Sequence, residues 1–115
     1  MKPIKPRVHG VIDYGACAAM LAAPSLLGLS GSARTLSYLF AGSYLAVSVF
    51  TDYPLAIQRV IPFPLHGKIE LGTVPALLLV AALQKDTRAR AYYLGLAGTV
   101  GTVYSLTDWE APSDS

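Results

Sequence analysis

Two histidine–carboxylate pairs are the residues of this sequence best suited to chemistry, because imidazole and carboxylate groups can transfer protons or bind metal ions. In each pair the two residues are four positions apart, His9 with Asp13 and His66 with Glu70. Residues four apart share one face of a helix, so each pair would present its two groups side by side. The spacing therefore predicts two local clusters of titratable side chains.

Both pairs belong to a longer pattern that occurs twice in the chain. His-Gly-Val-Ile-Asp-Tyr-Gly at 9–15 returns as His-Gly-Lys-Ile-Glu-Leu-Gly at 66–72, and Thr-Asp-Tyr at 51–53 returns as Thr-Asp-Trp at 107–109. The copies are offset by 57 residues at the histidines (9 to 66) and by 56 at the threonines (51 to 107). This regularity indicates a duplication.

The duplication divides the chain into repeat one, 9–53, and repeat two, 66–109. A unit of about 50 residues is expected to bury too little surface to fold alone. We therefore predict that residues 1–115 form a single domain in which the two repeats pack together.

Charge is scarce and unevenly placed. Only 14% of the residues are charged and 53% are hydrophobic, whereas roughly a quarter of the residues of a soluble domain are charged. Four long runs, 14–33, 35–51, 71–84 and 91–107, contain no charged residue at all. Runs of this kind between charged joints are typical of membrane-spanning helices. The predicted spans are His9–Leu29, Thr35–Thr51, His66–Gln84 and Ala91–Thr107.

The predicted fold is therefore all-α, a four-transmembrane-helix bundle made of two tandem helical hairpins. An even number of spans places both termini and the link between the repeats on one side of the membrane. Five basic residues on that side against four on the other favour cytoplasmic termini. The same topology gathers six polar side chains at one end of the bundle, related by a pseudo-twofold axis: His9, Asp13, Asp52, His66, Glu70 and Asp108.

Three interpretations of this polar end remain open from the sequence. It could be a structural hydrogen-bond network that fixes the packing of the two repeats. It could carry protons or small solutes through coupled titration of histidines and carboxylates. It could also bind metal or haem, although the order His-x-x-x-Asp/Glu differs from the Glu-x-x-His of carboxylate-bridged helix bundles. No cofactor is predicted from the sequence alone.

The predicted function is that of a small integral membrane protein of structural or accessory type. Small residues at 41–43 and at positions 95, 98 and 101 would let helices approach closely in lipid, which suits a homo-oligomer or a larger membrane complex. A net charge of +2 does not suggest nucleic-acid binding. The sequence contains no nucleophile or phosphate-binding motif, so enzymatic activity has no positive support.

The repeated unit resembles the SPW-repeat family of small bacterial integral membrane proteins. In that family a His-Gly-x-x-Asp-Tyr start leads through a helix to an Ala-Pro turn and a second helix. The resemblance covers nearly the whole chain, with Ser25 here in place of the family's tryptophan. It implies a four-span protein of the bacterial inner membrane. The matching residues are His9, Gly10, Asp13, Tyr14, Gly15, Ala23 and Pro24, and more loosely His66, Gly67, Glu70 and Gly72.

Overall fold

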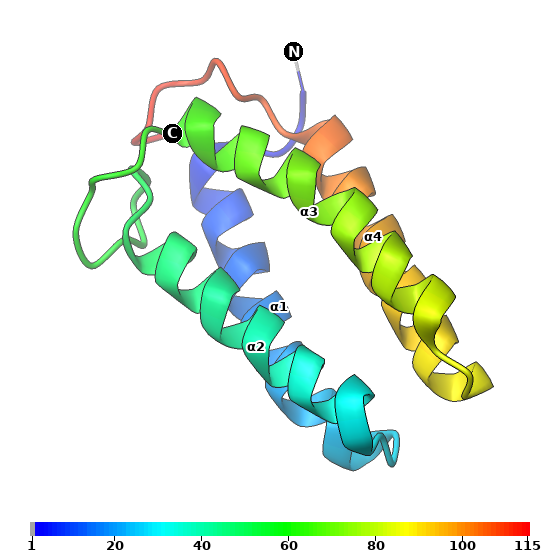
Figure 1. The fold of residues 1–115 in the computed structure, drawn as a ribbon. Helices are drawn as coiled ribbons and strands as arrows, with labels where there is room; N and C mark the ends of the chain where they lie inside the picture. Colours follow the sequence, from blue (N-terminus) through cyan, green and yellow to red (C-terminus); the bar gives the residue numbers. More distant parts are fainter. Residues whose placement is uncertain (1) are drawn as a thin grey trace.

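A computed structural model describes residues 2–115, and in this part of the chain it contains four helices and no β-strand. Two isolated β-bridges, between Ile4 and Thr107 and between Thr51 and Ile61, hold the chain segments at one end. The predicted all-α class and the four helices are confirmed. The helices are α1 (Pro6–Leu26), α2 (Gly31–Val49), α3 (Phe63–Leu83) and α4 (Thr87–Leu106) (Figure 1).

Each helix begins three or four residues before the predicted span. Prolines in the first turn start α1 and α3, because the fixed φ of proline suits a helix start and its missing N–H has no partner there anyway. At α4 the Asp86 side chain caps the helix by accepting a hydrogen bond from the Ala89 N–H at 3.3 Å. The uncharged runs therefore mark the apolar part of each helix but miss its polar first turn.

The four helices form two antiparallel hairpins, α1–α2 and α3–α4, which lie side by side (Figure 1). Small residues such as Ala41, Ala81 and Ala97 fill the core, together with Met20 and Tyr93. Both termini and the link between the repeats, 50–62, lie at one end of the bundle, as the topology predicts.

Hydrogen bonds join the hairpins at the opposite end. The Tyr93 hydroxyl donates to the Ala33 carbonyl at 2.6 Å, and Arg88 Nη1 donates to the Leu27 carbonyl at 2.8 Å. The first turns of α4 are thereby tied to the α1–α2 turn. Gly28 and Gly31 form this turn with positive φ values of 67° and 58°, a conformation that glycine adopts without strain.

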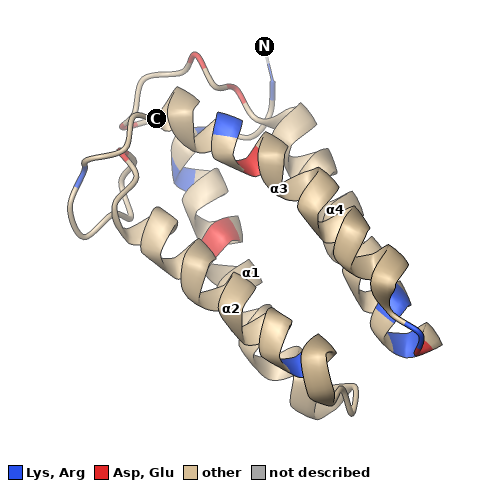
Figure 2. Ribbon diagram, in the orientation of Figure 1, with Lys and Arg blue, Asp and Glu red and all other residues tan. Residues whose placement is uncertain are grey.

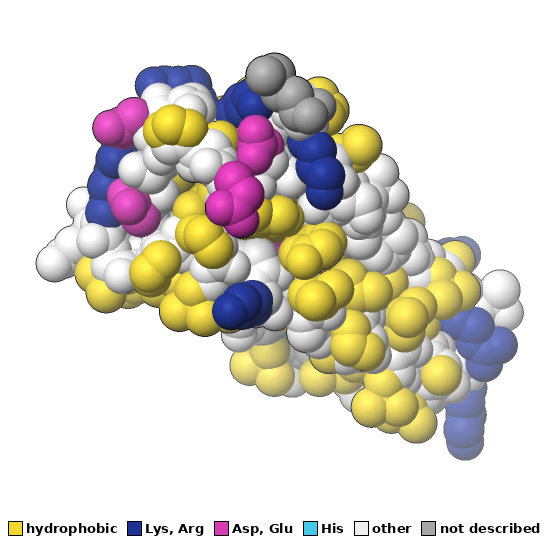
Figure 3. Space-filling model, turned by 90° about the horizontal axis from the view of Figure 1, so that it is seen from above, with side chains coloured by type: hydrophobic (Ala, Val, Ile, Leu, Met, Phe, Trp, Pro, Cys, Tyr) yellow, Lys and Arg dark blue, Asp and Glu magenta, His cyan; other side chains and the backbone are white. Residues whose placement is uncertain are grey.

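Charged residues lie mainly near the two ends of the helices and leave the middle of the bundle uncharged (Figure 2). Figure 3 shows the molecule from the end that carries the termini. Charged side chains cluster over that end, and hydrophobic side chains cover the side of the bundle that extends away from the viewer. Large hydrophobic residues are exposed on all four helices, for example Leu21, Leu39, Leu79 and Leu94. The outer surface is therefore strongly apolar.

Helix α3 is long and apolar enough to cross a membrane, and within residues 2–115 it is the one helix that qualifies. The other three are less hydropathic because small and hydroxyl-bearing residues replace leucine, isoleucine and valine in them; charge does not make the difference, since α3 itself contains Lys68 and Glu70. The structure thus establishes four helices and one candidate span.

Candidate functional site

Two histidines and two carboxylates from the repeated motif come together inside the bundle. His9 and Asp13 lie on α1 and His66 and Glu70 on α3, near the end that carries the termini. Both histidines are 0% exposed, and the acidic residues are 2% and 3% exposed. One nitrogen or oxygen atom from each residue lies within 4.8 Å of the others. The helical spacing puts each pair on one face, and the packing of the hairpins joins the two faces.

The four side chains are linked across the repeats as well as within them. His9 Nε2 lies 3.0 Å from Glu70 Oε1, and His66 Nε2 lies 3.1 Å from Asp13 Oδ2. The contacts within each helix are slightly longer, 3.3 Å from His9 Nε2 to Asp13 Oδ1 and 3.2 Å from His66 Nε2 to Glu70 Oε1. Each imidazole therefore faces both carboxylates, in the pseudo-twofold arrangement expected of a duplication.

The other nitrogen of each imidazole contacts a threonine of the opposite repeat. His9 Nδ1 lies 2.9 Å from Thr107 Oγ1, and His66 Nδ1 lies 2.7 Å from Thr51 Oγ1. Both threonine hydroxyls donate to the backbone carbonyl four residues earlier, at 2.6 Å in each case. Since a hydroxyl has one proton, each threonine accepts from the histidine. The Nδ1 atoms therefore carry hydrogen, and the Nε2 atoms point at the carboxylates.

Aromatic side chains enclose the cluster. The Trp109 ring lies with its centroid 4.9 Å from that of His9 and 4.7 Å from that of Phe63. It packs so closely on Gly67 that a Cβ there would lie 2.9 Å from the indole. Tyr53, the equivalent residue of repeat one, is fully buried, and its hydroxyl donates to Asp13 Oδ2 at 3.2 Å. The aromatic residue of each Thr-Asp-aromatic motif thus closes one side of the site.

Asp52 and Asp108, the two other predicted site residues, lie at the same end of the bundle but do not join the cluster. Asp108 Oδ2 accepts a 2.8 Å hydrogen bond from Lys5 Nζ, and this bond holds the pKa of the Asp108 carboxyl below its ordinary value of 3.8. Asp52 Oδ1 lies 3.5 Å from Arg59 Nη1, and its side chain is 40% exposed. Both aspartates belong to surface ion pairs.

Thr51, Thr107, Tyr53 and Trp109 are the residues of the site that the sequence prediction left out. They stand in the same repeated triplets as the two surface aspartates. The aspartates are the charged residues of these triplets, but the flanking threonine and aromatic residue are the ones that reach the histidines. The duplication itself was the signal that could have identified them, because these residues return with the same offset.

The hydrogen-bond inventory of the cluster is incomplete. Four nitrogen–oxygen contacts are present, but two Nε2 atoms can supply at most two hydrogens. Among residues 2–115, two buried side-chain oxygens have no partner, Ser48 Oγ and Glu70 Oε2. An unpaired carboxylate oxygen is more costly to bury than an unpaired hydroxyl. Glu70 is therefore the member of the cluster whose bonding is least satisfied.

The spacing of the donor atoms suits a metal ion. In a tetrahedral zinc site with ligand distances of about 2.0–2.1 Å, neighbouring donor atoms lie about 3.3–3.4 Å apart. The four imidazole–carboxylate distances here are 3.3, 3.0, 3.1 and 3.2 Å. Imidazole nitrogen and carboxylate oxygen are ordinary ligands of zinc, manganese and iron. These contacts use both oxygens of Asp13, and with one donor atom per residue the four donors lie within 4.8 Å of one another, so a divalent transition-metal ion fits once the side chains move inward around it.

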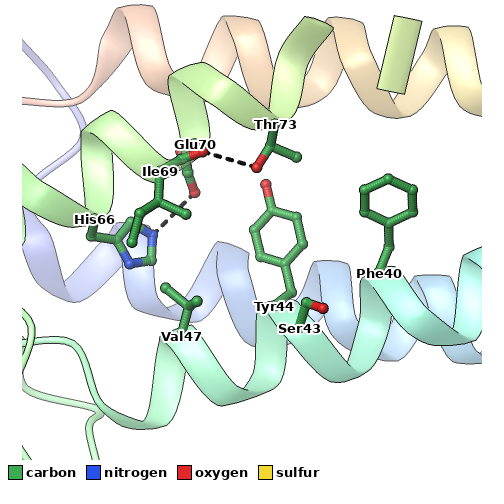
Figure 4. A pocket seen from close by; sticks show the side chains of 8 residues that line it. All are labelled: Phe40, Ser43, Tyr44, Val47, His66, Ile69, Glu70 and Thr73. Atoms are coloured by element: carbon green, nitrogen blue, oxygen red, sulfur yellow. Dashed lines mark hydrogen bonds and ion pairs between the residues drawn. The ribbon is translucent and has the colours of Figure 1, made fainter. Parts of the chain in front are cut away.

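A pocket of about 140 Å³ adjoins the cluster between α2 and α3. Its lining combines one side of the cluster with hydroxyl and apolar side chains of α2 and α3. Figure 4 shows Glu70 and Thr73 on α3 facing Tyr44 on α2. The lining residues are Phe40, Ser43, Tyr44, Val47, His66, Ile69, Glu70 and Thr73.

Comparison with protein-family models, with curated proteins and with solved structures finds no match to the chain. The resemblance to the SPW-repeat family therefore stays a prediction that depends on the quoted motif residues. Any functional assignment must come from the geometry of the buried cluster.

Proposed function

We propose that this protein is an integral membrane protein that binds a divalent transition-metal ion. The ligands are Nε2 of His9, Nε2 of His66 and the carboxylates of Asp13 and Glu70. The observation that carries the proposal is the convergence of these four buried groups, with imidazole–carboxylate contacts of 3.0 to 3.3 Å and one donor atom of each residue within 4.8 Å of the others. The imidazole–carboxylate contacts are close to the separations expected between the ligands of one tetrahedral ion, and the wider separations would shorten around it.

A metal ion accounts for the cluster better than hydrogen bonds alone. Two hydrogens cannot satisfy four short contacts, whereas one cation can interact with all four donor atoms simultaneously. Two carboxylates also balance the charge of a divalent ion, which makes the loaded site neutral in a buried, apolar setting. The ion would thus remove the shortage of hydrogens and the electrostatic cost together.

The threonines support the same conclusion. Metal-bound histidines normally donate their second ring N–H to a fixed acceptor, which sets the tautomer and the ring orientation. Here Thr107 and Thr51 accept from Nδ1 of His9 and His66, and backbone carbonyls hold both hydroxyls in place. This leaves both Nε2 atoms directed toward the centre of the cluster.

The membrane part of the proposal is supported by helix length and by the surface. The four helices have 19 to 21 residues, which at 1.5 Å per residue corresponds to roughly 28 to 32 Å, about the thickness of a bilayer core. Polar groups of α1 such as His9 and Asp13 face inward, so they lower the hydropathy of the helix without contacting lipid. Resistance of the membrane-bound protein to extraction by alkaline carbonate tests this assignment.

A purely structural role and a transport role are the competing predictions. Transport requires polar groups that lead onward through the bundle, but the next buried side chains along α1 and α3 are the apolar Cys17, Met20 and Leu77. A structural role predicts that the cluster is complete without an added ion. Metal analysis separates this role from the proposed one.

The experiment is to purify the protein in detergent and measure bound metal by elemental analysis, with zinc, manganese and iron each offered. We expect one ion per cluster in the parent protein. Asp13→Asn, which preserves shape, should weaken binding at least about tenfold, because it removes an anionic ligand. Asp108→Asn is the matched control, since Asp108 lies outside the cluster in a surface ion pair.

The folded state of each variant is checked by helical circular dichroism and gel filtration. Added metal should also raise the melting temperature of the parent, because a ligand that binds only the folded state stabilises it. Substoichiometric metal in the parent, or equal metal content in the Asp13→Asn and Asp108→Asn variants, would refute the metal site and favour the structural interpretation.

A further inference from the structure

Glu70 uses only one of its oxygens in the cluster. Oε1 contacts both imidazoles, at 3.0 Å from His9 Nε2 and 3.2 Å from His66 Nε2. Oε2 has no hydrogen-bond partner, although the side chain is only 4% exposed. Asp13, the equivalent residue of repeat one, uses both oxygens and has the Tyr53 hydroxyl as a further donor. Glu70 Oε2 is therefore an acceptor without a donor.

The pocket between α2 and α3 lies on this side of the cluster, and Glu70 forms part of its wall. Tyr44 rises from α2 toward Glu70 and Thr73, so hydroxyl groups stand near the carboxylate (Figure 4). Phe40, Val47 and Ile69 supply apolar walls. Such a combination of apolar walls and a few polar groups is typical of pockets that bind small molecules.

The equivalent positions on α1 and α4 lack two of these hydroxyl groups. Offsets of 57 and 56 residues place Ala16 opposite Thr73, and Val100 opposite Tyr44. Both replacements remove a hydroxyl group. The polar character of the pocket is thus specific to the α2–α3 side, where Glu70, the residue with the unpartnered oxygen, forms part of the wall.

We propose that this pocket binds a small, neutral, hydroxyl-bearing amphiphile, of the phenol or alcohol class, whose hydroxyl donates a hydrogen bond to Glu70 Oε2. A donor is required because Oε2 can only accept. A neutral molecule is required because the carboxylates are already balanced by the imidazoles or by a metal ion. Exposed Ser43 and Ile69 at the rim connect the pocket with the apolar outer surface, so the ligand enters from the lipid side.

This ligand does not depend on the proposed metal ion, because Oε2 lacks a donor whichever atom Oε1 contacts. The test uses ¹⁹F NMR of purified protein in detergent with two probes of nearly the same size, 4-fluorophenol and 4-fluoroanisole. Only the phenol can donate a hydrogen bond. Metal content is measured on the same samples, so that failure of the metal site and failure of the pocket are recorded separately.

Two variants locate the binding site. Ser43→Phe fills the rim of the pocket, and Thr99→Phe places the same ring at the equivalent exposed position of repeat two. We expect saturable binding of 4-fluorophenol, at least about tenfold tighter than that of 4-fluoroanisole, because loss of the donor leaves a buried acceptor unpaired. We expect Ser43→Phe to weaken the binding of 4-fluorophenol by at least about tenfold and Thr99→Phe to leave that binding unchanged.

Equal affinity for the two probes would mean that the pocket selects only apolar volume, and this would overturn the proposal. Absence of saturable binding, or equal binding by the Ser43→Phe and Thr99→Phe variants, would also overturn it, with water remaining as the partner of Glu70.

Discussion

The two repeats contribute equivalent histidines and threonines to the cluster, but their aromatic residues make different hydrogen bonds. In both, a histidine contacts the opposite repeat's threonine and both carboxylates. In repeat one the aromatic Tyr53 donates its hydroxyl to Asp13 at 3.2 Å. In repeat two the equivalent Trp109 directs its Nε1–H to the backbone carbonyl of Tyr104 at 3.1 Å. The carboxylate of repeat two is therefore left with an unpartnered oxygen.

The repeated residues of the cluster fall into two groups, those that are identical in both repeats and those that differ. The histidines and threonines occur identically in both repeats, and they hold the cluster together across the two hairpins. The carboxylate and the aromatic residue differ between the repeats, and they determine which side of the cluster is closed. The histidines and threonines of a duplicated site can thus stay the same while the carboxylate and the aromatic residue of one repeat change and leave a pocket beside the cluster.

The threonines should produce the largest effects and should be equivalent. Thr107→Val and Thr51→Val each keep side-chain shape but leave a buried Nδ1–H without an acceptor. We expect each to lower the free energy of unfolding by about 1–3 kcal/mol and to weaken metal binding about 10- to 100-fold. Chemical unfolding and metal titration measure the two effects. A large effect from only one threonine would show that the two repeats do not contribute equally to the cluster.

The glycines should distinguish the repeats. A Cβ at Gly67 would lie 2.9 Å from the Trp109 ring, whereas one at Gly10 would lie 3.2 Å from the movable end of Leu55. We expect Gly67→Ala to destabilise by about 1–2 kcal/mol, because overpacking exceeds the gain in helix propensity. Gly10→Ala should be neutral or slightly stabilising. Melting temperatures of the two variants, measured side by side, check this contrast.

Removal of one hydroxyl should make the repeats more alike. Tyr53→Phe takes away the donor to Asp13 Oδ2, which still contacts His66 Nε2 at 3.1 Å. We expect a loss of about 1 kcal/mol, the usual contribution of one hydrogen bond. The fold and the binding of 4-fluorophenol on the Glu70 side should be retained. A loss of phenol binding equal to that of Ser43→Phe would mean that the ligand sits against Asp13 instead of Glu70.

The surface ion pairs should have the smallest effect and should depend on pH. The Lys5 hydrogen bond holds the pKa of Asp108 below 3.8, so the folded state favours the ionised form. Its stabilising contribution is present above about pH 4 and is lost as the pH falls through the lower folded-state value. The melting temperatures of the parent and of Asp108→Asn should therefore differ slightly at about pH 6 and converge at about pH 2.

The corresponding change in repeat one is the control for this pair. Asp52 lies 3.5 Å from Arg59, a longer contact than the 2.8 Å between Asp108 and Lys5. Asp52→Asn should therefore have a smaller effect than Asp108→Asn at about pH 6, since exposed ion pairs contribute little. A difference that grows on acidification would contradict the assigned direction of the Asp108 pKa.

Much of the helical frame could be predicted from the sequence. The duplication, the four apolar runs and the placement of six polar residues at one end all follow from local patterns. The helix starts were predicted three or four residues late, because Pro6 and Pro64 and the Asp86 cap begin helices outside the apolar runs. Membrane spanning was predicted for four helices, and composition in the described structure supports it directly for α3.

The sequence by itself determined which residues of the site share a helix face. A four-residue spacing within a helix is enough to place His9 beside Asp13 and His66 beside Glu70, because helical geometry is local. Only the tertiary structure decided that Thr107 holds His9, 98 positions away in the chain, and that Asp52 and Asp108 remain outside. Hydrogen bonds depend on separations of a few tenths of an ångström, which the packing of two hairpins sets and a linear pattern of residues does not contain.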